Sequence, residues 1–426
     1  DIYGSKKQFE RFVKNIENLT KKPKKNKRRF YYVKNKENLT DFRKLCNTFA
    51  SKDLSYIRRG RLFQVLKVIC YATEKNLKNC ERDDINEIVA FMHTRYKTYE
   101  SKRDFIKDIK CIWKVLFPET DIKGRADETL TPYVVRHLSR SIDKSKQKRR
   151  NEKYTIEEFE KILRYFDNAP KIQAYITAIQ ETYTRPQELC YLKIRDFEFF
   201  DSYGIAHVSE HGKEGTKTIQ FETLSYPFIL KWFKAHPKRK DPNAFFFIVE
   251  SNNGKYSQMT NHTVNMRLKK ACRDLGIDKQ ITCYSLKRMG ITIDRMNGVP
   301  DKIIMAKAGW TSTKQLQVYD LGTRDEALRM SLIRKGLVNA ETPNEKKFEP
   351  KQRVCEYCKF VNGFSEEICN GCFRPLIREK IQEIHDTHKR VSQHAIMHKL
   401  NKMEKFCESL GSRNNLQQSI EHMENY

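Results

Sequence analysis

The residues of this chain that are best suited to chemistry are basic and aromatic, and they follow one another in a fixed order. Arg185 comes first, the pair Lys287-Arg288 follows much later, and Trp310 precedes Tyr319 by nine residues. A tyrosine can attack phosphorus once its proton is removed, and guanidinium and ammonium groups can stabilise the negative charge that develops on the phosphate. This set predicts cleavage of a phosphodiester through a covalent tyrosine intermediate, which requires no metal ion.

The overall charge favours a polyanionic partner. The chain has 83 Lys and Arg residues against 54 Asp and Glu, a formal net charge of +29 and a pI near 9.5. Such an excess attracts phosphate backbones, so double-stranded DNA is the expected partner. An anionic membrane would also attract this charge, but no apolar run long enough to span one and no signal-type start is present. We therefore expect a cytoplasmic, nucleoid-associated protein with neither a membrane partner nor a small-molecule substrate.

A four-cysteine cluster in the last fifth of the chain predicts a structural zinc site. The chain has 12 cysteines and no recognisable secretory segment, which indicates reduced thiols rather than a disulfide framework. Two Cys-x-x-Cys pairs separated by ten residues can supply four thiolates to one tetrahedral Zn²⁺, with no open coordination position. The ligands would be Cys355, Cys358, Cys369 and Cys372.

The elements that must position these residues form two or more domains, since 426 residues exceed the size of one core. Residues 1–38 are expected to form a basic N-terminal arm, because the run of lysines and arginines there cannot bury itself. Residues 39–118 carry apolar side chains at helical spacing and predict a small helical domain. Residues 119–152 end in a charged run without an apolar period, so we expect a basic linker.

The phosphate-chemistry candidates all fall in a second domain, residues 153–340. It opens with the capping box Thr155–Glu158 and is mainly helical, with a β-hairpin expected between residues 205 and 221. Residues 350–376 would form a zinc ribbon, and residues 377–426 an amphipathic helix. That helix could pair with a neighbouring subunit or fold back on its own domain. The expected fold class is therefore mainly α with a small β-sheet.

The ordered set resembles the tyrosine recombinase, or phage integrase, family over most of the second domain. The resemblance implies a helical core-binding domain followed by a mixed α/β catalytic domain. It implies that Arg185 clamps the scissile phosphate, that Trp310 donates a hydrogen bond to a non-bridging oxygen, and that Tyr319 is the nucleophile. Lys213 on the hairpin would protonate the leaving 5′ oxygen, with Lys217 as the alternative.

The second box of the family pattern, His-x-x-Arg, is altered in this chain. Counting back from Trp310 places Tyr284 at the histidine position. Lys287 then stands at the arginine position, with Arg288 one step beyond. A lysine keeps the charge but lacks the planar fork that holds two phosphate oxygens at once. Either Lys287 or Arg288 could contact the phosphate, and a phenol at position 284 can still donate a hydrogen bond.

The resemblance implies a site-specific DNA recombinase or integrase that cleaves and rejoins strands through a 3′-phosphotyrosine, without metal or ATP in the chemical step. It also implies a homotetramer on double-stranded DNA. The cysteine ribbon after the catalytic domain is similar to that of some archaeal integrase-like proteins. Two alternatives remain. The substitutions in the second box allow a weak or silent DNA-binding protein on the same scaffold, and the tyrosine chemistry is shared with type IB topoisomerases.

Overall fold

In a computed structural model, the chain folds as two compact units that divide at residue 151, and each is described by itself. The structure describes residues 4–22, 31–141, 151–208, 215–251, 253–341 and 347–377, and then the helical stretches 379–383, 385–387, 389–391, 393, 396–397 and 400–403. Helices dominate both units and every sheet is small, which confirms the expected fold class. None of the helices in these ranges is both long enough and apolar enough to cross a membrane.

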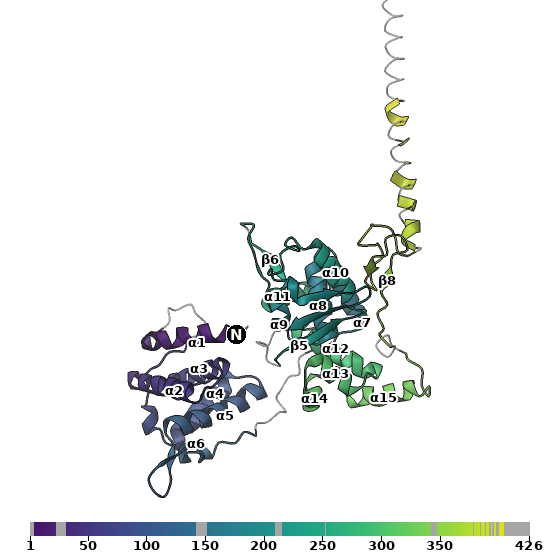
Figure 1. Cartoon of the computed structure of the whole chain (residues 1–426). Coiled ribbons are helices and arrows are strands. Elements are labelled where there is room, and N and C mark those ends of the chain that lie inside the picture. The colour runs from purple at the N-terminus through teal and green to yellow at the C-terminus, as the bar shows by residue number, and fades with distance from the viewer. Residues whose placement is uncertain are drawn as a thin grey trace, which may run out of the picture. The chain divides into compact units, whose positions relative to one another are not determined.

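The first unit is a bundle of helices around one apolar core (Figure 1). The side chains that recur at helical spacing in the sequence form this core, and Phe63, Ile109 and Trp113 are almost completely buried. The buried carboxylate of Asp108 accepts from Arg58 and from Arg61. The elements are α1 Ser5–Lys14, η1 Ile16–Thr20, η2 Lys36–Asn38, α2 Leu39–Ser51, α3 Tyr56–Ala72, η3 Leu77–Asn79, α4 Arg82–Arg95, α5 Tyr99–Leu116, β1 Glu119–Thr120, β2 Ala126–Asp127 and α6 Tyr133–Arg136.

The described part of the expected arm and residues 119–141 of the expected linker belong to this bundle. Phe9 of α1 is buried, and Phe12 stacks on Phe63 with ring centroids 5.4 Å apart. Val135 and Leu138, after the short β1–β2 hairpin, are buried in the same core. The apolar residues have helical spacing but are few among many lysines and arginines. The amino-acid composition of these segments therefore did not indicate that they pack in a core. Most of the basic run, residues 23–30, lies outside the described residues.

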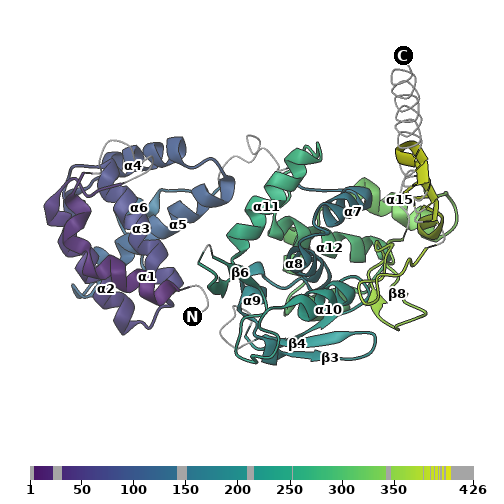
Figure 2. The same ribbon diagram turned by 90° about the horizontal axis from the view of Figure 1, so that it is seen from above.

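The second unit is built around α8, Pro170–Thr182. Eleven of its 13 residues are buried, because α10 and α12 (Figure 2) and strand β5 (Figure 1) pack against it. The capping box predicted at Thr155 is present and opens α7, Ile156–Tyr165. The remaining helices are α9 Pro186–Tyr191, η4 Ile194–Asp196, α10 Tyr226–Ala235, α11 Asn261–Asp274, α12 Cys283–Asn297, α13 Asp301–Ala308, α14 Lys314–Tyr319 and α15 Arg324–Arg334.

An antiparallel sheet of three strands, β3-β4-β5, lies beside α8. The strands are β3 Phe197–Phe199, β4 Gly204–Val208 and β5 Lys217–Phe221. In the register Val208 pairs with Lys217, so the predicted hairpin is confirmed and Lys217 begins its second strand. The tip of this hairpin, residues 209–214, lies outside the described residues, and Lys213 with it. A further two-stranded sheet joins β6, Ile248–Glu250, to β7, Tyr256–Gln258.

The four-cysteine module contains β8, Arg353–Val354, paired with β9, Val361–Asn362, and it packs against α10. Lys234 Nζ of α10 lies 3.8 Å from the centre of the Phe360 ring. Lys231 of α10 forms an ion pair with Glu366 at 2.8 Å. These contacts attach the module to the second unit through both apolar and charged side chains.

Candidate active site

Arg185 lies at a sharp junction between two helices. Helix α8 ends at Thr182, and Tyr183 then adopts a left-handed conformation with φ of 52°. For a residue other than glycine this costs about 1–2 kcal/mol. Arg185 is the N-cap of α9, and Pro186 fixes the first turn of that helix. The junction therefore fixes the backbone from which the Arg185 side chain, only 10% exposed, extends.

A buried carboxylate connects Arg185 to strand β5. Glu188, one turn into α9, has Oε1 3.4 Å from Arg185 Nη1 and Oε2 3.2 Å from Lys217 Nζ. Burial lowers the pKa of Lys217, and the charge of Glu188 acts in the opposite direction. A carboxylate shared by two buried cations fixes both side chains, because removing it would leave two buried positive charges facing each other.

Helix α12 presents Tyr284 and Lys287 on one face, since residues three apart lie on the same side of a helix. The helix begins at a capping box in which Thr282 and Ser285 bond to each other's backbone N–H groups. Tyr284 is 44% exposed, and partial burial raises its pKa. Lys287 is completely buried, and its Nζ has no hydrogen-bond partner among the described residues.

The environment of Lys287 disfavours its positive charge. Burial is the main cause, and repulsion from Lys217 and Arg185 adds to it, so that the pKa of Lys287 falls to about 7 although Glu188 acts in the opposite direction. The ammonium group faces aromatic rings: Nζ lies 5.1 Å from the ring centre of Tyr319 and 5.2 Å from that of Trp310. An anion placed beside Nζ would favour the charged form and raise this pKa.

Trp310 and Tyr319 lie side by side, with ring centroids 4.9 Å apart at 44°. Helix α13 ends at Gly309 with φ of 70°, a conformation that glycine adopts without strain, and Trp310 follows directly. Trp310 is buried, and its Nε1 donor has no hydrogen-bond partner among the described residues. Tyr319 ends α14 and is half-buried. Two buried donors, Nζ of Lys287 and Nε1 of Trp310, thus lie next to the predicted nucleophile.

Arg288 is held in other contacts. Its guanidinium forms an ion pair with Glu152, and Nη2 donates to the carbonyl of Val318 at 2.6 Å. Next to Tyr319, Arg295 Nη1 lies 2.5 Å from Asp320 Oδ2. Both arginines therefore fasten the end of α14 to α12. The two candidates for the arginine position differ in role, since Lys287 faces Trp310 and Tyr319 whereas Arg288 supports the backbone beside Tyr319.

Six of the seven predicted catalytic residues lie among the described residues, and Lys213 does not. Arg185, Lys287, Trp310 and Tyr319 converge, Tyr284 lies at the exposed side of the same helix face, and Arg288 serves as a support. Sequence reasoning did not assign a role to Glu188. The signal was present, because a glutamate three residues after an arginine can reach back to it across one helical turn.

The cysteine module brings all four predicted ligands together. The sulfur atoms of Cys355, Cys358, Cys369 and Cys372 lie within 4.8 Å of one another. The backbone N–H of Gly371 and the amide of Asn362 donate to the sulfur of Cys369 at 3.3 and 3.6 Å. Amide donors of this kind stabilise a thiolate, which is the form that binds a metal. The donor set fits a tetrahedral Zn²⁺.

Known proteins resemble this chain in sequence. Residues 152–323 match the model of the phage integrase family. The chain is 27% identical over 264 residues to the tyrosine recombinase XerA of Pyrococcus horikoshii, an alignment that covers 61% of this chain and 84% of that protein.

Solved structures with a similar fold are also recombinases. The Tn1549 transposon integrase in complex with transposon right end DNA matches 70% of this chain and 99% of its own, with a TM-score of 0.53 and 13% identity. A lambda integrase dimer bound to a COC′ core site matches 67% and 96%, with a TM-score of 0.51 and 15% identity. The recombinase XerH bound to a palindromic difH substrate matches 77% and 95%, with a TM-score of 0.52 and 13% identity.

Proposed function

We propose that Tyr319 is the nucleophile of this chain in site-specific recombination. Through residues 152–323 the chain belongs to the phage integrase family of tyrosine recombinases, an enzyme family that breaks and rejoins DNA. The observation that carries the proposal is the pair of buried donors beside Tyr319. Nζ of Lys287 and Nε1 of Trp310 have no hydrogen-bond partner among the described residues, and both are close to the phenol ring. Buried donors of this kind are costly unless a ligand satisfies them, and a phosphate offers the matching acceptors.

In the proposed cleavage step, the Tyr319 oxygen loses its proton and forms a bond to phosphorus while the bond from phosphorus to the 5′ oxygen breaks. The products are a 3′-phosphotyrosine and a 5′ hydroxyl, which has gained a proton. Arg185, Lys287 and Trp310 would contact the non-bridging oxygens, where negative charge develops in the transition state. Rejoining is the reverse attack by a 5′ hydroxyl, so the step needs neither ATP nor a metal ion.

The proton for the leaving oxygen is assigned to Lys213. Lys217 is the alternative, but its Nζ is 3.2 Å from Glu188 and its side chain is buried. We assign Lys217 to holding Glu188, and through it Arg185, in place. Tyr284 would donate a hydrogen bond to phosphate from the exposed side of the site. Its raised pKa keeps the phenol protonated near neutral pH, as a donor must be.

The remaining assignments follow from charge and from the cysteine module. The proposed partner is double-stranded DNA, on which four copies would assemble, and the proposed place of action is nucleoid DNA in the cytoplasm. Zn²⁺ held by the four cysteines would tie together residues 355–372, and no step of the cleavage chemistry is assigned to it.

The test is covalent capture on a duplex with a nick close to the cleavage site, since loss of the short 5′ fragment prevents rejoining. We expect a protein–DNA adduct that survives denaturation and forms without added divalent cations. Tyr319→Phe should form none, whereas Tyr203→Phe, at an exposed tyrosine away from the site, should match the wild type.

Two other outcomes would replace this proposal. Tight binding of the wild type without any adduct would identify a DNA-binding protein with a silent site, the alternative favoured by a lysine of low pKa at the arginine position. Relaxation of supercoiled DNA without strand exchange would identify a topoisomerase of the same chemistry.

A further inference from the structure

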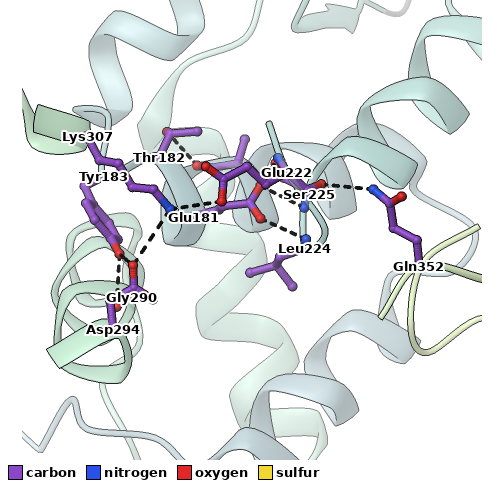
Figure 3. A network of polar contacts seen from close by, with 11 residues as sticks. Glu181, Thr182, Tyr183, Glu222, Leu224, Ser225, Gly290, Asp294, Lys307 and Gln352 are labelled. Carbon is purple, nitrogen blue, oxygen red and sulfur yellow. Dashed lines mark hydrogen bonds and ion pairs between the residues drawn. The ribbon is translucent and has the colours of Figure 1, made fainter. Parts of the chain in front are cut away.

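A second, partly buried polar cluster lies about two turns further along α12 than Lys287. We call it the acidic cluster, and its members are Glu181, Tyr183, Glu222, Asp294 and Lys307 (Figure 3). It borders a cavity of about 840 Å³. Nothing in the cleavage chemistry uses these residues.

Every polar side chain in the acidic cluster has a partner. The Tyr183 hydroxyl donates to Asp294, and Lys307 Nζ lies 3.1 Å from Glu222 and 3.8 Å from Asp294. Glu181 accepts at 2.8 Å from the backbone N–H groups of Glu222 and Leu224. The cluster is therefore internally satisfied and offers no unpaired donor to a ligand.

Each member of the acidic cluster lies on a segment that leads to the candidate active site. Tyr183 precedes Arg185 by two residues, and Lys307 precedes Trp310 by three. Asp294 shares α12 with Lys287, and Glu222 directly follows β5, which begins at Lys217. The cluster thus ties together the four segments that carry the proposed phosphate contacts and their support.

Tyr183 connects the acidic cluster to the nucleophile. Its ring is buried in an apolar cluster with Ile291, Leu316 and Trp310, against which Tyr319 packs. Its backbone has a φ of 52°, which is unusual for a bulky residue and has to be held by the surrounding structure. Packing of the ring and the hydrogen bond from the hydroxyl to Asp294 hold the Tyr183 side chain in place.

Gly290 makes this arrangement possible. A Cβ at this position would lie 1.9 Å from the Gln180 carbonyl oxygen and 3.0 Å from the Tyr183 ring. Helix α12 therefore approaches the end of α8 as closely as the backbones allow, and Tyr183 fills the space beside the contact.

We propose that Tyr183 is a positioning residue for strand cleavage: its ring fills the apolar cluster that holds Trp310 and its backbone turn aims Arg185, while Asp294 secures the side chain through the hydroxyl. The proposal rests on the proposed function above. Tyr183 itself contacts neither DNA nor the reacting atoms in this scheme, so its effect should appear in the rate of cleavage and not in the affinity for DNA.

Two substitutions distinguish the contribution of the Tyr183 ring from that of the Tyr183 hydroxyl. Tyr183→Gly accepts the left-handed backbone without strain but removes the ring, and single-turnover adduct formation at saturating DNA should slow on the order of 100-fold. Tyr183→Phe keeps the ring and should recover most of that loss, to within about tenfold of the wild type. DNA affinity should stay within about twofold for both.

The matched control is Tyr226→Phe. Tyr226 is another buried tyrosine of the second unit, and its hydroxyl donates to the Phe200 carbonyl away from the site. It should lower the free energy of unfolding without changing the adduct rate. Adduct formation by Tyr183→Gly at the wild-type rate, or equal rates for Tyr183→Gly and Tyr183→Phe, would overturn the proposal.

A readout that needs no cleavage distinguishes failure of this proposal from failure of the proposed function. The chain has three tryptophans, so 5-fluorotryptophan labelling gives three ¹⁹F resonances, and Trp310→Phe identifies the one from Trp310. Tyr183→Gly should shift and broaden that resonance, whereas Tyr183→Phe should leave it nearly unchanged. An unshifted Trp310 resonance in Tyr183→Gly would refute the packing role even if the wild type formed no adduct.

Discussion

Two polar clusters lie along α12, and they differ in how their charges are balanced. The site cluster contains three basic side chains, Arg185, Lys217 and Lys287, around one carboxylate, that of Glu188. The acidic cluster contains three carboxylates around one lysine, Lys307. All polar side chains of the acidic cluster are satisfied, whereas Lys287 and Trp310 keep buried donors without a partner among the described residues.

The difference indicates what each cluster is built for. A satisfied cluster stabilises the arrangement of the chain and gains nothing from a ligand. A cluster with excess positive charge and unpaired donors is destabilising by itself and becomes favourable only when an anion enters. Substitutions in the two clusters should therefore have opposite effects on stability, although both should slow cleavage.

The largest effect on stability is expected at Gly290, where the contact between α8 and α12 supports both clusters. Gly290→Val places a side chain where even a Cβ would overlap the Gln180 backbone. The contact between α8 and α12 must open, which should lower the free energy of unfolding by more than about 4 kcal/mol. Thermal unfolding and the yield of soluble protein measure this. The control is Gly60→Ala in the first unit, where nothing lies within 4 Å of the added Cβ. Equal stability of the two variants would contradict the packing described.

Lys287→Met should separate activity from stability. Loss of one aimed donor to the transition state slows the adduct-forming step by about 10²–10³-fold. The same change removes a buried cation that has no hydrogen-bond partner among the described residues, and the unbranched side chain can fill the space, so the free energy of unfolding should rise by about 1 kcal/mol or more.

The counterpart in the acidic cluster is Asp294→Ala. It leaves the Tyr183 hydroxyl with only the Gly290 carbonyl oxygen, 3.5 Å away, as an acceptor and should lower the free energy of unfolding by about 1–3 kcal/mol. Denaturant unfolding of both variants, together with single-turnover cleavage, measures the contrast. Changes of the same sign in stability would show that the charge balance of the two clusters has no energetic consequence.

The titration of Lys287 should make the free energy of unfolding depend on pH. Its pKa is about 7 in the folded protein against an ordinary value of 10.5. Between these values the unfolded chain binds a proton that the folded chain lacks, so the free energy of unfolding rises with pH, by up to about 1.4 kcal/mol per pH unit. The destabilising effect is complete below about pH 7 and disappears as the pH approaches about 10.

Unfolding titrations of the wild type and of Lys287→Met test this prediction, because the difference between their stabilities should shrink as pH rises. A difference that is constant from neutral to alkaline pH would mean that Lys287 stays charged in the folded protein. Phosphate should raise the pKa, so binding of a DNA site at about pH 8 should take up close to one proton. Calorimetry in buffers of different ionisation enthalpy measures that uptake.

The sequence alone predicts those site residues that have a fixed spacing or a turn signal. Arg185 before a proline, Trp310 after a glycine, and Tyr319 nine residues later could be named because each type suits its chemistry at that separation. The choice between Lys287 and Arg288 could not be made, because it depends on which side of α12 faces Trp310, and adjacent residues point about 100° apart on a helix.

Other features of the structure could not be predicted from the sequence pattern. The left-handed turn at Tyr183 could not be predicted, since tyrosine gives no turn signal and tertiary packing imposes the conformation. The described N-terminal helix and the residues around Val135 join the first unit although their sequences are dominated by charge. In both segments, one or two buried apolar side chains attach the segment to the core. The amino-acid composition, which is averaged over the segment, does not reveal so few residues.

The smallest effect on cleavage is expected from the cysteine module, which lies against α10. If the four cysteines hold the proposed zinc ion, Cys369→Ser should lower the zinc content per chain and should increase amide hydrogen exchange in residues 353–376. The module contacts α10 through Phe360 and Glu366, whereas both polar clusters are held by contacts between α8, α12 and their neighbours. Single-turnover cleavage by Cys369→Ser should therefore stay within about threefold of the wild type. A loss as large as that of Lys287→Met would show that the module, through Gln352 and its hydrogen bond to the Glu222 carbonyl, supports the acidic cluster and hence the site.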